Sequence, residues 1–142
     1  MVSSQQKLIA EILHAGRALA LSRDGLVAGH AMTGAKCRLL RTIHHLPVAF
    51  AVSAVARAMD VSRQTVFPMV KELVDEGLLE VVPNDRDRRV SLVTLTSLGH
   101  ARLEELLRLE ARWIADLTRG FDARMLAQAA WLLRLIRERA SP

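Results

Sequence analysis

Apolar and polar positions alternate along the middle of the chain with two different periods. Between residues 53 and 74, apolar side chains recur with the period of about 3.6 residues that an amphipathic helix produces. Between residues 78 and 95, two short runs rich in β-branched residues flank Pro83, Asn84 and Asp85, which favour a turn. The pattern therefore predicts two short helices followed by a two-stranded hairpin.

Each of the two helices is predicted from a capping residue and an apolar face. Ser53 can cap the first helix and Ser62 the second, because a serine hydroxyl accepts a hydrogen bond from an N–H of the first turn. Gly77 ends the second helix, where a left-handed residue commonly follows. The apolar faces consist of Val55, Ala56 and Met59 in the first helix and of Val66, Val70, Leu73 and Val74 in the second.

The polar face of the second helix and the tip of the hairpin favour duplex DNA as a partner. The helix carries residue types that contact base edges and phosphates, and three arginines crowd the hairpin tip, where they suit the minor groove or phosphates. Asp87 would repel phosphate, so we expect it to hold Arg89 through a charge-assisted hydrogen bond. A solvated charged surface is the alternative. The candidate DNA-binding residues are Ser62, Arg63, Gln64, Thr65, Lys71, Arg86, Asp87, Arg88 and Arg89.

These segments resemble the MarR family of dimeric winged helix-turn-helix transcription regulators. DVSRQTV at residues 60–66 is similar to the family's turn and the start of its recognition helix. Asp87-Arg88-Arg89 fits the family's Asp-x-Arg wing motif, and Leu95-Thr96 with Gly99 fits its Leu-Thr-x-x-Gly. The resemblance implies a mostly α fold with a small antiparallel β-wing and a twofold dimer built from N- and C-terminal helices. It also implies an effector pocket between the DNA-binding lobe and the dimerisation helices, often accepting aromatic or phenolic acids.

Phe67 and Pro68 stand where the family commonly has small polar or basic residues. If Ser62 is the cap, Pro68 falls in the second turn of the recognition helix, where it can cost about 3 kcal/mol. A cap at Thr65 would place Pro68 in the first turn, where proline is tolerated, and a kink is another solution. We expect a shortened or tilted reading face. We also expect a buried or partly buried Phe67, with a thymine methyl as its alternative contact.

The flanking segments predict further helices and a dimer. The order expected is an N-terminal dimerisation helix in residues 1–32, a winged helix-turn-helix lobe in 33–96 and C-terminal dimerisation helices in 97–142. The terminal helices carry more apolar surface than a lone winged domain needs, so a homodimer reading a pseudo-palindromic site is favoured. In the N-terminal part, we expect a helix over 3–22 capped by Ser3 or Ser4, followed by a loop or a frayed extension of that helix over 24–34. A second helix is expected from the Thr33 cap to His45, where Pro47 stops it, and a strand at 50–52. In the C-terminal part, we expect a helix from the Thr96 cap to Arg119, ended by Gly120, and a last helix over 121–139.

Composition narrows the class of protein. The 142 residues are 51% hydrophobic, which excludes a disordered chain, and a net charge of +5 modestly favours an anionic partner. A single cysteine, Cys37, excludes an intrachain disulfide and is typical of a reducing cytoplasm. The sequence lacks an apolar run of membrane-spanning length and the pattern of a signal peptide, so a cytoplasmic protein with no membrane partner is expected.

Candidate chemistry beyond DNA binding is sparse. Without a Gly-rich phosphate loop, an HExxH or a GxSxG motif, neither an enzyme nor a cofactor is expected. A metal-sensing variant of the regulator would need metal ligands from several elements. Cys37 lies mid-helix among apolar residues, which indicates a buried structural thiol. The expected function is that of a ligand-responsive repressor. The alternative is a protein–protein interaction module in which Phe67 and Pro68 are the anchors. The candidate effector-binding residues are Leu13, His14, Arg17, Met32, Trp113 and Leu117, with Arg17 or His14 facing a carboxylate and Trp113 either stacking on a ring or lying in the core.

Overall fold

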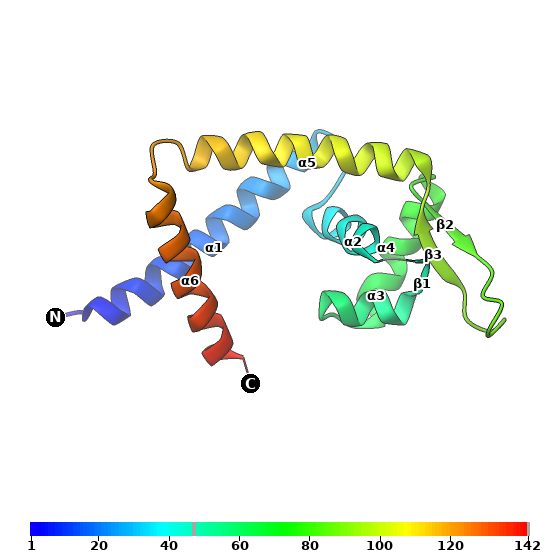
Figure 1. The fold of residues 1–142 in the computed structure, drawn as a ribbon, viewed down its shortest axis with the longest axis horizontal. Helices are drawn as coiled ribbons and strands as arrows, with labels where there is room; N and C mark the ends of the chain where they lie inside the picture. Colours follow the sequence, from blue (N-terminus) through cyan, green and yellow to red (C-terminus); the bar gives the residue numbers. More distant parts are fainter. Residues whose placement is uncertain (47, 142) are drawn as a thin grey trace. The chain divides into compact units, whose positions relative to one another are not determined.

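The computed structural model describes residues 1–46 and 48–141, and Figure 1 shows its ribbon. The chain divides into two units, Met1–Glu110 and Ala111–Pro142. The predicted mostly α fold with a small antiparallel sheet is confirmed. Its elements are α1 (Ser4–Ala28), α2 (Gly34–His45), β1 (Phe50–Ala51), α3 (Val52–Met59), α4 (Arg63–Asp75), β2 (Leu79–Val82), β3 (Leu92–Leu95), α5 (Ser97–Leu117) and α6 (Ala123–Ala140).

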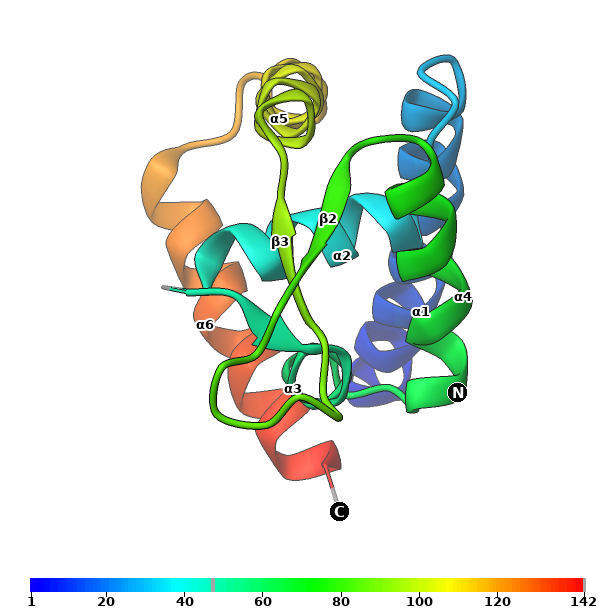
Figure 2. The same cartoon turned by 90° about the vertical axis from the view of Figure 1, so that its right-hand side faces the viewer.

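The three strands form an antiparallel sheet in the order β1-β3-β2. Leu79 lies opposite Leu95 in the hairpin, and Phe50 lies opposite Val93 on the other side of β3. The strand expected beside the wing is therefore present, although Val52 begins α3 and does not extend β1. Figure 2 shows the hairpin beside α4.

The hydrophobic core of the first unit lies among α2, α3, α4, the sheet and the start of α5. The predicted apolar faces of α3 and α4 are buried, except that Val74 is only partly so. Because these faces turn inward, the polar side chains of the same helices turn outward. The largest fully buried side chains are Leu39, Leu40, Val55, Val66, Leu73, Leu79, Val93, Leu103 and Leu106.

Four predicted helix caps are confirmed, Ser3 among them, and two are wrong. Thr33, Ser62 and Thr96 each accept a hydrogen bond from an N–H of the following turn. Ser53 is not a cap, because α3 begins at Val52, so that Ser53 is its second residue and Ala51 occupies the N-cap position. The Thr65 alternative also fails, since the Thr65 N–H itself donates to Ser62 Oγ over 3.2 Å.

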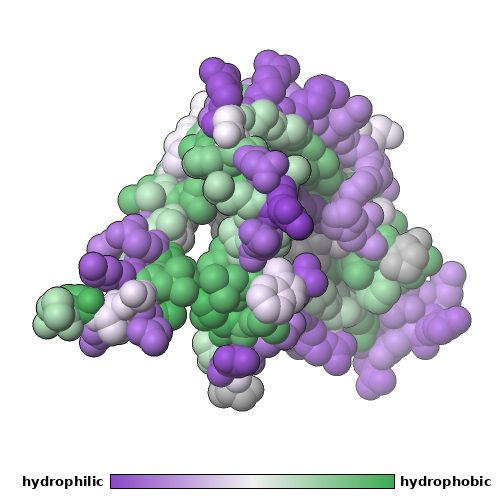
Figure 3. Space-filling view, turned by 60° about the vertical axis from the view of Figure 1, so that its left-hand side comes forward, coloured by the Kyte–Doolittle hydropathy of each residue, from purple (hydrophilic) through white to green (hydrophobic). Residues whose placement is uncertain are grey.

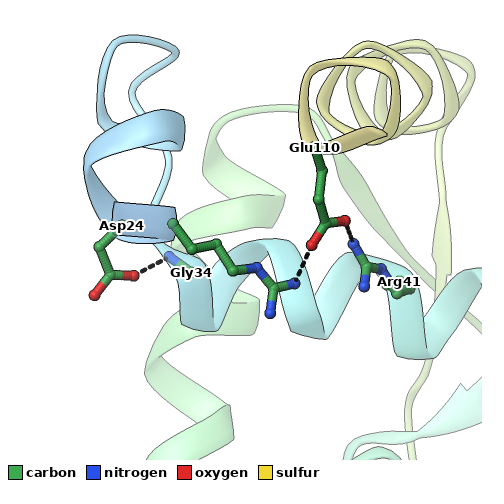
Figure 4. Close-up of polar contacts among 5 residues, drawn as sticks. Asp24, Gly34, Arg41 and Glu110 are labelled. Atoms are coloured by element: carbon green, nitrogen blue, oxygen red, sulfur yellow. Dashed lines mark hydrogen bonds and ion pairs between the residues drawn. The ribbon is translucent and has the colours of Figure 1, made fainter. Parts of the chain in front are cut away.

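The first helix is longer than the hydrophobic pattern predicts. It begins with a capping box of Ser3 and Gln6 and continues to Ala28. Of the two alternatives for residues 24–34, an extension of the helix is therefore found over residues 24–28, and a loop follows. Burial of Val27, which is 2% exposed, draws this last turn into the core. Asp24 Oδ1 also accepts a hydrogen bond from the Gly34 N–H over 3.1 Å (Figure 4). Pro47, the expected stop of the next helix, lies outside the described residues.

Both terminal helices leave apolar side chains uncovered within their own units. Across its described length, α6 has no buried residue, and on α1 only Val27 is buried. Figure 3 shows hydrophobic patches among hydrophilic side chains on the face that it draws. The exposed large apolar residues are Leu8, Ile9, Leu13, Leu19 and Leu21 on α1 and Met125, Leu126, Trp131, Leu132 and Leu133 on α6. Among residues 1–46 and 48–141, the structure offers no helix that is both long enough and apolar enough for a membrane span.

Candidate nucleic-acid interface

The turn between α3 and α4 is held by its backbone and by one arginine. Asp60 follows α3 in the left-handed conformation, with φ 55°, and its N–H donates to the Arg57 carbonyl. Arg38 of α2 donates from Nη2 to the Met59 carbonyl over 2.9 Å. These bonds satisfy carbonyls at the end of α3, which a helix otherwise leaves unpaired. The turn thus delivers the chain to α4 in a defined direction.

The N-terminus of α4 presents two exposed polar side chains on a capped helix. Ser62 Oγ contacts Thr65 Oγ1 at 2.8 Å as well as the Thr65 N–H, so these two hydroxyls stabilise the first turn. Arg63 and Gln64 lie between them and are exposed, as is Lys71 two turns later. Ser62 and Thr65 therefore stabilise the start of the helix, while the side chains of Arg63, Gln64 and Lys71 are exposed to solvent.

Pro68 lies inside α4, and Phe67 beside it is exposed. The helix is continuous from Arg63 to Asp75, so Pro68 is its sixth residue and offers no N–H to the Gln64 carbonyl. Phe67 is 57% exposed, and the expectation that it is buried or partly buried is wrong. The reason is helical geometry, since Val66 points into the core and the next residue turns about 100° away from it. Phe67 instead lines a concavity with Arg63, Gln64 and Pro68.

The tip of the wing is built by two side-chain-to-backbone turns. Asn84 Oδ1 accepts from the Arg86 N–H over 3.0 Å, and Asp87 Oδ1 accepts from the Arg89 N–H over 3.0 Å. Asp87 Oδ1 also accepts from Arg89 Nε over 3.2 Å, which confirms the predicted contact between this carboxylate and the arginine. The Arg89 side chain is still 90% exposed. Asp87 thus orients the backbone of Arg89 and one edge of its guanidinium, while the remaining N–H groups of the guanidinium face solvent.

The fold brings the recognition helix and one wing arginine to the same concavity. Arg63, Phe67 and Arg89 line it together with residues of β1, α3 and the segment before β3. Lys71 and Phe67 line an adjoining apolar groove against Val81 of the wing. Arg86 and Arg88 do not join them, since each lines a separate concavity on the wing. The predicted site residues therefore converge around Arg63 and Arg89 and spread outward along the wing.

Comparisons with known proteins agree with this geometry. The MarR family model matches residues 31–90, from the turn before α2 to the wing tip. Over this segment, 60 of the 142 residues, the chain is similar to the MarR family. A cysteine-to-serine mutant of E. coli MarR in complex with operator DNA is similar over 91% of this chain and 97% of that chain, with 26% identity and a TM-score of 0.72. The Streptomyces coelicolor PcaV regulator with its natural ligand is 24% identical over 90% and 92% of the two chains, with a TM-score of 0.75.

Apo wild-type E. coli MarR shares the fold at 22% identity, with coverage of 89% and 94% and a TM-score of 0.77. A search of curated sequences finds no significant match. MarR family members are transcription regulators and not enzymes, in agreement with the expectation from the sequence.

Lys36, which the sequence did not single out, ties α4 to α2. Lys36 Nζ lies 2.7 Å from Glu72 Oε2 and 3.0 Å from Glu76 Oε1, and its side chain is only 13% exposed. The hydrogen bonds to Glu72 and Glu76 raise the pKa of Lys36 above 10.5. One ammonium thus holds two successive turns at the C-terminal half of α4, at the opposite end of the helix from Arg63.

Replacing Lys36 with methionine is expected to lower the stability of the MarR-family fold by about 1 kcal/mol near neutral pH, because two charge-assisted hydrogen bonds are lost. A lysine with a raised folded pKa stabilises fully below the unfolded value and loses this contribution as the pH rises through the folded pKa. The difference between the two proteins should therefore shrink above pH 10.5. Urea unfolding at several pH values measures it. Lys7→Met is the control, and an equal loss in both variants would contradict the role of Lys36.

A second polar junction joins three helices of the Met1–Glu110 unit. Glu110 of α5 pairs with Arg23 of α1 over 3.1 Å and accepts a hydrogen bond from Arg41 of α2 (Figure 4). Cys37 lies beside these groups and is 2% exposed, as expected of a structural thiol. Burial raises its pKa, against the opposing influence of Arg41 and Arg23. This thiol is therefore kept in its protonated, less reactive form.

The candidate effector-binding residues are divided between the two units. Leu13, His14 and Arg17 are exposed on α1, whereas Met32 is 4% exposed and belongs to the core. Trp113, which is half-buried, and Leu117, which is exposed, lie in the Ala111–Pro142 unit. Their assignment to one pocket stays a prediction. Among the residues described, no three His, Cys, Asp or Glu side chains gather in a way that suits a metal ion.

Proposed function

We propose that this protein is a ligand-responsive repressor of the MarR family that binds a pseudo-palindromic operator in duplex DNA as a homodimer. The observation that carries the DNA-binding part is the convergence of Arg63 on the recognition helix and Arg89 on the wing at one concavity. The similarity to the E. coli MarR mutant solved with operator DNA supports it.

The two elements have different tasks in this proposal. Arg63 and Gln64 enter the major groove, where arginine pairs with guanine and glutamine with adenine through two hydrogen bonds each. Lys71 and the wing residues Arg86, Arg88 and Arg89 contact phosphates or the minor groove. Asp87 orients Arg89 in advance, so less side-chain freedom is lost on binding.

The uncovered apolar surfaces of α1 and α6 support the homodimer. Surfaces of this kind on a small chain commonly mark protein contacts. A twofold dimer places two recognition helices on half-sites whose centres are roughly 34 Å apart, one turn of the DNA helix. The operator should therefore be a pseudo-palindrome with one half-site per chain.

An aromatic or phenolic acid is the effector class in this proposal. Within the first unit, Arg17 or His14 of α1 meets the carboxylate, and Leu13 supplies apolar contact. The Streptomyces coelicolor PcaV regulator was solved with its natural ligand, which supports ligand control in a related fold. Such a ligand acts by binding one arrangement of the recognition helices better than another, so that the spacing no longer matches the operator.

The test is fluorescence anisotropy of the purified protein on the DNA upstream of its own gene, over a salt series, with a random duplex as control. We expect tight, salt-sensitive binding that prefers the upstream DNA at two chains per duplex, and release by an aromatic acid. Equal weak binding to both duplexes, combined with a genomic selection that enriches no palindrome, would overturn the proposal. The exposed Phe67 and Pro68 would then favour a protein–protein module.

Arg89→Ala is expected to weaken binding to all duplexes by about tenfold and to reduce the slope of log affinity against log salt by about 1, because a phosphate contact is lost. The same anisotropy series measures both quantities. Asp87→Asn should weaken binding less, since the arginine remains but is no longer held by a charged acceptor. Arg139→Ala on α6 serves as the control for net charge. An unchanged salt slope in Arg89→Ala would show that this arginine does not reach the DNA backbone.

A further inference from the structure

We propose that Phe67 reads the 5-methyl group of a thymine in the major groove and so fixes one thymine in each half-site. This inference rests on the proposed DNA binding and adds a specificity-determining residue to it. It concerns a side chain that departs from the polar and basic character of the rest of the recognition surface.

The position of Phe67 within α4 is the first observation. Its side chain is 57% exposed, whereas the apolar face of the helix is complete without it, with Val66 and Leu73 fully buried. The phenyl ring therefore contributes little to the core and leaves apolar surface in water, which is unfavourable in the unbound protein. A ring in this position gains when an apolar group of a partner covers it.

The neighbours of Phe67 are the second observation. Phe67 follows Arg63 by four residues and Gln64 by three, so the three side chains share one face of the helix. Pro68 lines the same concavity and extends its apolar part. The face thus combines two hydrogen-bonding side chains with a ring about one helical turn further along, a rise of about 6 Å.

The chemistry of the major groove matches this combination. Thymine alone among the four DNA bases carries a methyl group at the groove edge, and phenylalanine is among the side chains that contact it. A rise of about 6 Å corresponds to roughly two base steps of 3.4 Å, so Phe67 meets a base pair near those read by Arg63 and Gln64. Polar side chains at the position of Phe67 would not distinguish a methyl group from its absence.

The test uses a duplex selected from a random library by the wild-type protein. Each thymine is replaced in turn by deoxyuridine, which removes only the methyl group, and affinity is measured by anisotropy. One thymine per half-site is expected to weaken wild-type binding about fivefold when replaced. Phe67→Ala should bind the parent duplex more weakly and lose its sensitivity to that replacement, and Phe67→Leu should retain part of it. Leu98→Ala, which removes an exposed apolar side chain from the start of α5, should keep the full wild-type sensitivity.

The outcomes separate this inference from the proposed function. Tight binding that no deoxyuridine replacement weakens would overturn the role of Phe67 while leaving the regulator intact. Sensitivity that persists in Phe67→Ala would also overturn it, because another group would then read the methyl. A library from which the wild-type protein enriches no sequence would overturn the proposed function and this inference with it.

Discussion

Gly99→Ala is expected to destabilise the fold by about 3 kcal/mol, because an added methyl group would overlap the backbone of Leu78, just before β2. A Cβ built on Gly99 lies 2.0 Å from the Leu78 carbonyl oxygen and 2.9 Å from Leu95 Cδ2. The first contact is with main chain at the entrance to β2, which cannot rotate away as a side chain can. The start of α5 must therefore move away from the sheet.

Moving α5 breaks a set of hydrogen bonds that depend on this close approach. The Gly99 N–H donates to Thr96 Oγ1 over 2.9 Å, and Thr96 Oγ1 donates to the Gly77 carbonyl over 2.6 Å. The Thr96 N–H donates over 3.1 Å to the same Leu78 carbonyl that the methyl group would strike. One substitution thus disturbs the cap of α5, the end of α4 and the hairpin together.

Thermal and urea unfolding followed by circular dichroism measure the effect. The control is Gly25→Ala in α1, where an added Cβ meets nothing within 4 Å. Because alanine favours a helix interior over glycine by about 1 kcal/mol, that variant should be as stable as the wild type or more so. A Gly99→Ala protein that unfolds with the wild type would show that α5 can separate from β2 without cost.

Short-range features of this chain could be predicted from its sequence. The Ser62 cap, the left-handed Gly77 and the contact from Asp87 to Arg89 each involve residues within a few positions of one another. Local backbone geometry and hydrogen-bonding capacity decide such features, and both are encoded in neighbouring residues. The order of helices and hairpin follows from the hydrophobic period for the same reason.

Long-range polar contacts could not be predicted in the same way. Lys36 lies 40 residues from Glu76, and Arg41 lies 69 residues from Glu110. Charged residues are frequent on helix surfaces, so the sequence does not indicate which acid faces which base. The exposure of Phe67 could not be predicted either. Successive residues of a helix point about 100° apart, so an apolar residue next to a buried one in the sequence can face either the core or the solvent.

The second unit and α1 mark a further limit of sequence reasoning. Their apolar side chains predict burial, yet within each unit much of this surface is exposed. A hydrophobic period shows that a face needs a partner but does not show which one. The proposed homodimer is an inference from that uncovered surface.

Glu110→Gln is expected to destabilise the fold by about 2 kcal/mol, because it leaves two guanidinium groups without their shared counter-charge. The Glu110 side chain is 14% exposed, and Arg23 and Arg41 are 28% and 29% exposed. Removing one partner of a fully buried pair costs about 3–5 kcal/mol, and solvent at the two arginines reduces the expected loss. Glutamine keeps the shape of the side chain, so the change isolates the charge.

Glu104→Gln on the same helix is the matched control. Glu104 pairs with Arg108 over 3.3 Å, but these side chains are 73% and 60% exposed, so their loss should cost less than about 0.5 kcal/mol. Urea unfolding of both variants compares a half-buried junction with a surface pair on one helix. Arg41→Met alone should also destabilise, and its combination with Glu110→Gln should cost less than the sum of the two, since the carboxylate and the guanidinium interact directly. Additive losses would show that Glu110 and Arg41 act independently and that their contact does not couple α2 to α5.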